Sequence, residues 1–204
     1  LNCLHHLPAQ LLIAALVLRP EERPAVRRIA TAAFAAMLAA ELLLIHAVRT
    51  VYPETELPLK ITVGEFGKPE LRGIELEFSL SHSADMVLCA ISSKCVGADI
   101  QLRAAYNAAL AERFFTKKEA AAIAQAADKD RMFTQTWAVK ESYLKLLGTG
   151  MHRPLSSFDA KCDNGCFPID GAPECLVSIM ERGNYTLAVS ALTDEVPEFI
   201  EVRL

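Results

Sequence analysis

The sequence predicts an α+β fold, because its helix-rich and strand-rich stretches are segregated along the chain. An Ala/Leu-rich stretch from residue 24 to about 48 contains few helix breakers. Residues 52–91 and 150–204 consist of short runs with period-two alternation and turns. This segregation is typical of α+β folds. The order of long helix, strands, helices and strands favours two α+β halves with a border near residues 93–103, drawn here as 1–98 and 99–204.

The composition is that of a folded protein without a strongly basic surface. Of the 204 residues, 52% are hydrophobic and 23% are charged, which is enough apolar material for a core. The formal net charge is −4, so the general field of a nucleic-acid binder is missing. An anionic ligand must therefore be held by local positive groups.

Six cysteines are scattered without a C-x-x-C pair, which predicts free thiols and a cytoplasmic location. The apolar run at residues 11–18 has no basic lead-in and is too short to span a bilayer. We therefore expect neither a membrane segment nor a signal peptide.

The N-terminal part predicts two helices. Residues 8–18 predict a short helix that ends before Pro20, and the first residues of the chain are compatible with a strand. Acidic residues and Pro24 favour the start of the long helix, which runs to about Val48. Three arginines near its beginning form a cationic cluster that is ordinarily a solvated surface: Arg23, Arg27 and Arg28.

Three strands are predicted next. Residues 59–63 and 74–78 alternate with period two, and residues 86–91 form a continuous apolar run. Lys68 lies in a Gly-Lys-Pro turn between the first two.

The second of these strands leads into Ser81, His82 and Ser83. We expect this segment to connect two strands at one edge of a sheet, where loops usually carry function. Gly97 permits another backbone to approach closely, and we expect Asp99 to end a further strand.

The middle of the chain predicts three helices. Residues 104–111 form the first, and Thr116 and Glu119 have the capping-box order at the start of the second, which runs to about residue 127. Asp130 is the expected N-cap of the third, and Gly148 is its expected end.

The third helix has one periodic apolar face, made of Phe133, Trp137, Leu144 and Leu147. Trp137 is therefore expected in the core. Glu141 and Lys145 are four residues apart and project from the same side, with Lys140 one step round the helix. Such a pair is ordinarily a surface ion pair of little consequence.

The C-terminal part predicts strands joined by turns, with residues 182–184 as a hairpin turn. The expected strands are residues 157–161, 166–169, 175–180, 185–191 and 199–203.

Five polar residues gain meaning when they are considered together. Asp99 and Glu141 offer the hard oxygen ligands that Mg²⁺ prefers. Lys68, His82 and Lys145 are suited to phosphate groups. The set predicts a site for a polyphosphate ligand with one divalent metal.

The order of five sequence blocks closely resembles the motif series of the 4′-phosphopantetheinyl transferase superfamily, and best its single-chain type. The blocks are F-G-K-P at 66–69, F-S-L-S-H-S at 78–83, V-G-A-D-I at 96–100, R-F-F-T-x-x-E at 113–119 and W-x-x-K-E-S-Y-x-K-x-x-G-x-G at 137–150. The resemblance implies two pseudo-duplicated α+β halves with an active site at their interface.

The resemblance also implies an activity: Mg²⁺-dependent transfer of the phosphopantetheine arm of coenzyme A to a serine of an apo carrier protein, releasing 3′,5′-ADP. By matching position, Asp99 and Glu141 would bind Mg²⁺, and Glu141 would accept the proton of the serine. Lys145 and His82 would contact phosphates during catalysis. Four more residues would contact coenzyme A: Lys68, Ser81, Lys140 and, near the 3′-phosphate, Arg28. Members of this type usually complete the site within one chain, which implies a monomer.

One position departs from the family pattern. Gln101 stands where a second acid is common, two residues after Asp99. It is expected beside the metal, and its neutral amide leaves open a second interpretation, a catalytically weakened coenzyme A-binding module. A Ser/His hydrolase is not supported, because the chain lacks a G-x-S-x-G nucleophile elbow.

Overall fold

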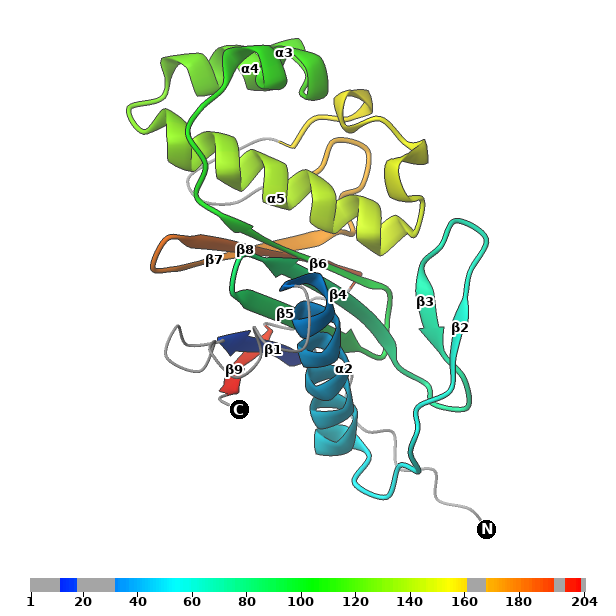
Figure 1. Ribbon diagram of the computed structural model, residues 1–204. Helices are drawn as coiled ribbons and strands as arrows, with labels where there is room; N and C mark the ends of the chain where they lie inside the picture. The colour runs from blue at the N-terminus through cyan, green and yellow to red at the C-terminus, as the bar shows by residue number, and fades with distance from the viewer. Residues whose placement is uncertain (1–11, 18–31, 161–167, 193–196, 203–204) are drawn as a thin grey trace.

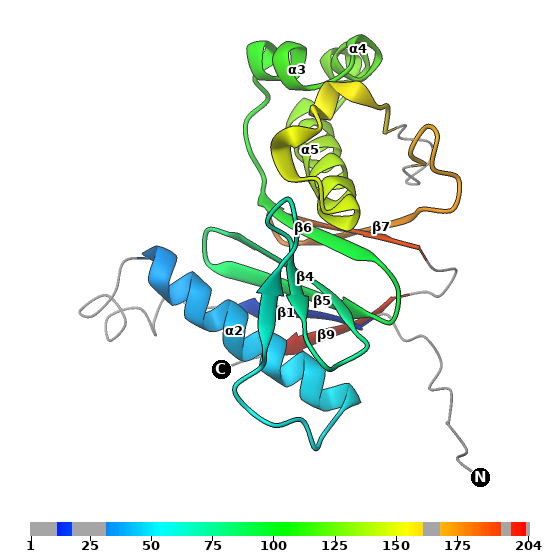
Figure 2. The same ribbon diagram turned by 90° about the vertical axis from the view of Figure 1, so that its right-hand side faces the viewer.

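The computed structural model describes residues 12–17, 32–160, 168–192 and 197–202. They form four layers, shown in two orientations in Figures 1 and 2: a helical layer, a three-stranded sheet, a four-stranded sheet and a single long helix. The observed architecture is therefore α+β, as predicted. None of the helices in the described part of the chain is long and apolar enough to cross a membrane.

The four-stranded sheet has the order β4-β5-β1-β9. Its strands are β1 (Leu12–Val17), β4 (Glu77–Ser83), β5 (Met86–Ser92) and β9 (Glu198–Val202). β1 pairs antiparallel with β5 and parallel with β9. The helix predicted at residues 8–18 is therefore wrong where the structure describes it, since residues 12–17 form an inner strand.

Helix α2 (Ala32–Val51) covers the outer face of this sheet (Figure 1). Its buried face, including Leu43, Leu44 and Val48, packs against Phe78 and Val87 of the sheet. The predicted long helix is thus confirmed in its described part. Its predicted start, with Arg23, Arg27 and Arg28, lies outside the described residues.

The three-stranded sheet has the order β6-β8-β7 and is antiparallel throughout. Its strands are β6 (Val96–Leu102), β7 (Leu176–Arg182) and β8 (Tyr185–Ala191). The order β7-β8-β6 in this sheet repeats the order β4-β5-β1 in the other. In each set the strand that comes earliest in the chain, β6 or β1, is separated from the other two by a long helix. The border predicted between residues 98 and 99 falls within β6 and stays a prediction.

Three helices lie above this sheet: α3 (Ala108–Phe114), α4 (Lys117–Gln125) and α5 (Lys129–Leu147). The capping box at the start of α4 is confirmed, because the Thr116 side chain accepts from the Glu119 amide and the Glu119 side chain accepts from the Thr116 amide. α5 ends, as predicted, at Gly148, which has the left-handed conformation typical of a helix stop. Its N-cap is Asp128 and not Asp130, whose carboxylate instead accepts from the Tyr106 amide.

The remaining strands follow the sequence pattern only in part: the strand predicted at residues 74–78 begins at Glu77, and Pro69, predicted in a turn, begins a strand that was not predicted. β2 (Ile61–Val63) and β3 (Pro69–Leu71) form a separate hairpin beside α5 (Figure 2). The hairpin turn predicted at residues 182–184 joins β7 to β8. The strand predicted at residues 157–161 is wrong over its described part, because a 3₁₀ turn at Leu155–Ser157 is followed only by an isolated bridge between Ala160 and Ile169.

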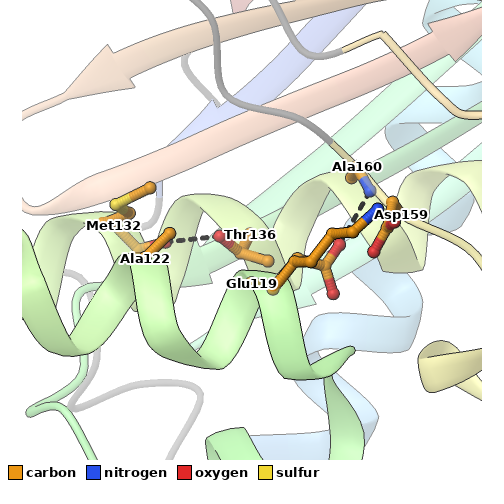
Figure 3. Close-up of a pocket in the computed structure, with 7 residues that line it drawn as sticks. Glu119, Ala122, Met132, Thr136, Asp159 and Ala160 are labelled. Atoms are coloured by element: carbon orange, nitrogen blue, oxygen red, sulfur yellow. Dashed lines mark hydrogen bonds and ion pairs between the residues drawn. The ribbon is translucent and has the colours of Figure 1, made fainter.

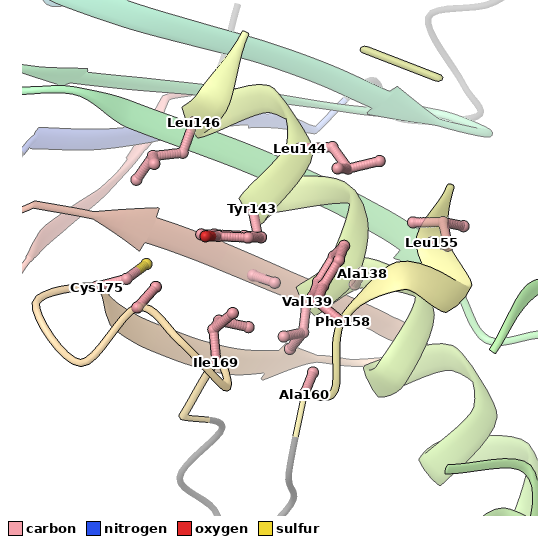
Figure 4. Packing of buried hydrophobic residues seen from close by; sticks show 12 residues of the cluster. Ala138, Val139, Tyr143, Leu144, Leu146, Leu155, Phe158, Ala160, Ile169 and Cys175 are labelled. Atoms are coloured by element: carbon pink, nitrogen blue, oxygen red, sulfur yellow. The ribbon is translucent and has the colours of Figure 1, made fainter. Parts of the chain in front are cut away.

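Separate apolar clusters hold the layers together. Met86, Leu88 and Ile100 belong to the cluster between the two sheets. Figure 4 shows the cluster between α5 and the three-stranded sheet, where Tyr143 and Phe158 pack against the loop that carries Ile169. Three cysteines in the described ranges are free thiols, Cys89, Cys95 and Cys175, in agreement with the sequence prediction for those positions.

Candidate active site

Gly97 lets α5 cross directly over β6. A Cβ atom at this position would lie 2.0 Å from the Ser142 carbonyl oxygen and 2.2 Å from the Leu146 amide nitrogen, both backbone atoms of α5. Residues 97, 99 and 101 lie on the same face of β6, because every second residue of a strand points to the same side. The close crossing at Gly97 therefore places Asp99 beneath the side chain of Lys145.

Asp99 is the centre of a hydrogen-bond network. Its side chain is 4% exposed, and its Oδ1 atom accepts from Lys145 Nζ at 2.7 Å and from Ser81 Oγ at 2.7 Å. Its Oδ2 atom accepts from Gln101 Nε2 at 2.8 Å. The sequence analysis expected Asp99 to end its strand, and this is wrong: Asp99 lies in the middle of β6.

Glu141 lies one helical turn before Lys145 and also faces this network. Burial raises the pKa of its carboxyl group, and the negative charge of Asp99 raises it further, while Lys145 opposes both. Within the described part of the chain, no hydrogen-bond donor is assigned to the Glu141 carboxylate. Its oxygens are thus available to a proton or a cation.

Ser81 belongs to a ladder of serines that joins the two sheets. The hydroxyl oxygens of Ser79, Ser81 and Ser83, on β4, accept from the amides of residues 98, 100 and 102, on β6, at 2.9, 3.3 and 2.9 Å. Of these three serines, only Ser81 also contacts the cluster of Asp99, Glu141 and Lys145, which we call the acid site. There its hydroxyl accepts from Lys145 Nζ at 2.9 Å. The three serines therefore lie within a strand, and not in a strand connection as predicted.

His82 points away from this network. It alternates with Ser81 and Ser83 along β4, so its exposed side chain lies on the sheet face that carries Phe78 and α2. The structure thus separates His82 from Asp99 and Lys145, which the sequence analysis grouped with it.

Lys68 lies at the C-terminal end of α5. Its Nζ atom donates to the carbonyl oxygens of Leu146 at 3.3 Å and Val96 at 3.4 Å, and forms an ion pair with Glu77 at 3.3 Å. Its aliphatic stem passes over Gly148. A cation at this position satisfies the last carbonyl groups of the helix.

Lys140 does not belong to the acid site. Its side chain has no exposed surface, and its Nζ atom donates to both carboxylate oxygens of Glu119, at 2.6 and 2.8 Å, and to the Phe158 carbonyl oxygen. Figure 3 shows Glu119 also accepting from the Ala160 amide, so the pair ties α4, α5 and residues 158–160 together. Lys140 was expected to contact coenzyme A, but in the structure it forms a buried ion pair with Glu119 instead.

A divalent cation at this site would depend on few protein ligands. No group of three or more His, Cys, Asp or Glu side chains within the described ranges is placed to hold a metal. Asp99 and Glu141 supply two carboxylates, and the Gln101 amide adjoins them. This set fits Mg²⁺, which usually keeps several waters and uses one or two carboxylates together with substrate phosphates.

An apolar pocket of about 200 Å³ adjoins Gln101. Leu102 and Leu110 line it with 41% and 38% of their surface exposed. Trp137 also lines it, and its half-buried indole packs against Phe114, Phe115 and Phe133, so the predicted core position is confirmed only in part.

Two features of the site were not found from the sequence. Glu119, the ion-pair partner of Lys140, is 21 residues away in the sequence, and the sequence analysis predicted only its role in the capping box of α4. The role of Ser79 and Ser83 was also missed, although the period-two spacing of three serines was a usable signal for one polar strand face.

Comparisons with known proteins point to one family. A model of the 4′-phosphopantetheinyl transferase superfamily matches residues 95–185. The chain is 33% identical over 150 residues to a 4′-phosphopantetheinyl transferase of Bacillus subtilis, covering 69% of this chain and 66% of that protein. It is 32% identical over 151 residues to 4′-phosphopantetheinyl transferase Sfp of Bacillus subtilis strain 168, covering 70% and 67%.

The match to each of these relatives spans about two thirds of the relative's length. Among solved structures, Thermotoga maritima holo-[acyl-carrier-protein] synthase aligns with a TM-score of 0.41 and 19% identity, over 47% of this chain and 61% of that chain. The region matched by the family model, residues 95–185, contains Gly97, Asp99, Glu141 and Lys145. On this sequence similarity, the chain belongs to the 4′-phosphopantetheinyl transferase superfamily, a superfamily of enzymes.

Proposed function

We propose that this protein transfers the 4′-phosphopantetheine arm of coenzyme A to a serine hydroxyl of an apo acyl or peptidyl carrier protein and releases 3′,5′-ADP. The observation that carries the proposal is the hydrogen-bonded ion pair between Lys145 and Asp99, with Glu141 one helical turn away. All three residues lie inside the segment that matches the family model. These groups suit a reaction that removes a proton from an alcohol and places negative charge on a phosphate.

In the proposed reaction, the serine oxygen bonds to the β-phosphorus of coenzyme A, and the bond from that phosphorus to the 3′,5′-ADP oxygen breaks. Glu141 accepts the serine proton, directly or through water. Its raised pKa makes it a stronger base than an ordinary carboxylate. The Lys145 ammonium stabilises the charge that develops on the departing phosphate.

The metal in this proposal is Mg²⁺, held by Asp99 and Glu141, with Gln101 beside them as an oxygen ligand or as a partner of a metal-bound water. It would neutralise charge on the pyrophosphate when bound. The structural support is the donor set: the buried Asp99 carboxylate and the Glu141 carboxyl, whose pKa is raised by burial and then by the charge of Asp99.

Coenzyme A is proposed to extend from this centre toward Lys68 and His82, with Arg28 as a further contact. Lys68 is 15% exposed and lies beside the end of α5, and His82 is exposed on β4. Ser81 is proposed to contact the ligand only through Lys145, because its hydroxyl already bonds Asp99 and the Ile100 amide.

The partner is proposed to be an acyl or peptidyl carrier domain and not a nucleic acid, in a cytoplasmic setting. A monomer is proposed because Ser81, Asp99, Glu141 and Lys145 come together within one chain.

Mass spectrometry of apo carrier proteins incubated with the protein, coenzyme A and Mg²⁺ tests this function. The expected result is a carrier mass gain equal to one phosphopantetheine group, dependent on Mg²⁺. Tight coenzyme A binding without a mass gain on any of several acyl and peptidyl carriers would instead support the binding module that Gln101 left open.

A further inference from the structure

The Asp99 carboxylate is almost fully engaged by the protein itself. A carboxylate has about four acceptor positions on its two oxygens. Lys145 and Ser81 occupy Oδ1, and Gln101 occupies one position on Oδ2. One position on Oδ2 remains, so a cation that binds Asp99 either takes that position and lies close to the Lys145 ammonium, or displaces one of the three donors.

The three donors differ in how they would respond to a cation. Ser81 and Gln101 are neutral, and Ser81 is additionally fixed by the Ile100 amide. Lys145 carries a positive charge, and its side chain is 31% exposed on a flexible stem. A divalent cation bound to Asp99 would lie close to the Lys145 ammonium, and repulsion between two nearby positive charges inside a protein is strong. The ammonium is therefore the donor that the cation displaces.

We propose that Lys145 is a competing counter-ion of Asp99, so that the site binds a divalent cation tightly only after a diphosphate ligand has drawn the lysine away. The inference rests on the proposed function, because it takes the coenzyme A pyrophosphate as that ligand. It adds an energetic coupling between the two: coenzyme A strengthens cation binding, and by reciprocity the cation strengthens coenzyme A binding.

The coupling also explains why a cation, and not only a lysine, is compatible with so enclosed an acid. Asp99 is 4% exposed, and an unpaired carboxylate there would be costly. Lys145 satisfies it in the free protein. When the ammonium moves to phosphate, the incoming metal replaces the lost positive charge.

Binding of Mn²⁺ to the free protein, followed by electron paramagnetic resonance of the unbound ion, tests the inference without any turnover. Lys145→Met is expected to bind Mn²⁺ at least roughly tenfold more tightly than wild type, because the competing charge is gone. Lys118→Met is the matched control, since it removes another lysine paired with an aspartate, Asp159 on the far side of α5. It is expected to change Mn²⁺ affinity by less than about twofold.

Adding coenzyme A without a carrier gives the second readout. Coenzyme A is expected to tighten Mn²⁺ binding more in wild type than in Lys145→Met, because only wild type has a lysine to release from Asp99. The same variant is expected to lose transfer activity. Tighter metal binding with lower activity is an outcome that simple damage to the site does not produce.

Equal or weaker Mn²⁺ binding by Lys145→Met overturns the inference, provided that urea denaturation shows the variant to be folded. Lys145→Gln, which keeps a hydrogen-bond donor and removes only the charge, replaces it if it is not. If wild type modifies a carrier while Lys145→Gln binds Mn²⁺ no better, the inference fails and the proposed function stands. If wild type neither binds Mn²⁺ in the presence of coenzyme A nor modifies any carrier, both fail.

Discussion

Glu141, the proposed catalytic base, is a residue whose ionised carboxylate is expected to lower the stability of the fold. Its carboxyl is partly buried next to Asp99, and both burial and that neighbouring charge raise its pKa. The ionised form, which is the proposed base, is therefore disfavoured in the folded state. A neutral side chain of the same shape relieves this effect.

Glu141→Gln is expected to lower transfer by about 10²–10⁴-fold, the usual contribution of general-base catalysis, or by more if the residue also holds the metal. In metal-free buffer near pH 7.5 the variant is expected to be more stable than wild type by at most about 1 kcal/mol, because a partly exposed carboxyl is screened by solvent. Urea denaturation measures the stability, and carrier mass spectrometry the activity.

The pH dependence gives a check on the cause. A carboxyl whose pKa is raised on folding destabilises the protein above that folded pKa, where it must ionise, and has no effect below its unfolded pKa. The stability advantage of Glu141→Gln should therefore shrink as the pH falls through the raised value toward the ordinary one. An advantage that is constant with pH would show that ionisation is not its origin.

Gln101→Glu tests the neighbouring position. The change removes the Nε2 donor from Asp99 and adds a third carboxylate to the site. It is expected to lower the Mg²⁺ concentration for half-maximal transfer several-fold, because a divalent cation is attracted by the added charge. The metal-free variant is expected to melt at a lower temperature than wild type. An unchanged Mg²⁺ requirement would exclude residue 101 from the metal site.

The sequence placed Glu141 and Lys145 correctly on one helix face but assigned Lys140 wrongly. Lys140 is in fact in phase with Phe133, Trp137 and Leu144, at spacings of four, three and four, so it belongs to the buried face. Helical periodicity alone could have shown this. Its partner Glu119 could not be found in that way, because the pairing depends on how α4 packs on α5.

At the scale of elements, the site depends on the contact of α5 with β6. That contact is possible only because Gly97 has no side chain, as the atoms above it are backbone atoms that cannot move aside independently. The sequence predicted a close backbone approach at Gly97. It did not identify α5 as the approaching element.

Gly97→Ala is expected to lower the free energy of unfolding by about 3 kcal/mol and to lower transfer activity more than stability alone explains. The added methyl group must push α5 away from β6, which separates Lys145 from Asp99. Gly64→Ala is the matched control: its Cβ would come within 3 Å only of the Glu70 side chain, at 2.7 Å, and that chain can rotate. Equal losses in the two variants, measured by urea denaturation, would contradict the proposed crossing.

β1 shows where local sequence signals are insufficient. Its Leu- and Ala-rich composition favours a helix. In the structure it lies between β5 and β9, and both of its edges are paired. Tertiary pairing with strands at least 69 residues away along the chain thus overrides local propensity, and no pattern within residues 8–18 predicts it.

At the scale of the whole molecule, the two sheets are joined through serine hydroxyls and not only through apolar packing. The amides of Ala98 and Leu102 donate to Ser79 and Ser83 across this junction. Ser79 is 5% exposed, whereas Ser83 lies near the open end of β4. The two positions make the same kind of hydrogen bond with different access to water.

Ser79→Ala is expected to cost about 1–3 kcal/mol, because it leaves the buried Ala98 amide without a partner. Ser83→Ala is expected to cost less, since water can replace the hydroxyl. Hydrogen exchange of the Ala98 and Leu102 amides, together with urea denaturation, measures both effects. A larger loss for Ser83→Ala than for Ser79→Ala would contradict this account of the junction.

The fold class, most strands and the acid site were predictable because they depend on local patterns and on motif order. The layer arrangement was not, because the seam between β4 and β6 uses side-chain hydroxyls whose partners lie 19 residues away. His82 is the clearest case: it adjoins Ser81 in sequence, and the strand alternation sends the two side chains to opposite faces.

The parallel pairing of β1 with β9 has a consequence for how the chain folds as it is synthesised. The first described strand has its complete set of neighbours only once residues 198–202 have left the ribosome. Until then one edge of β1 offers unpaired backbone groups, which invite pairing with other chains. A shortened chain that stops before Glu198 would keep every residue of the acid site and yet be expected to aggregate.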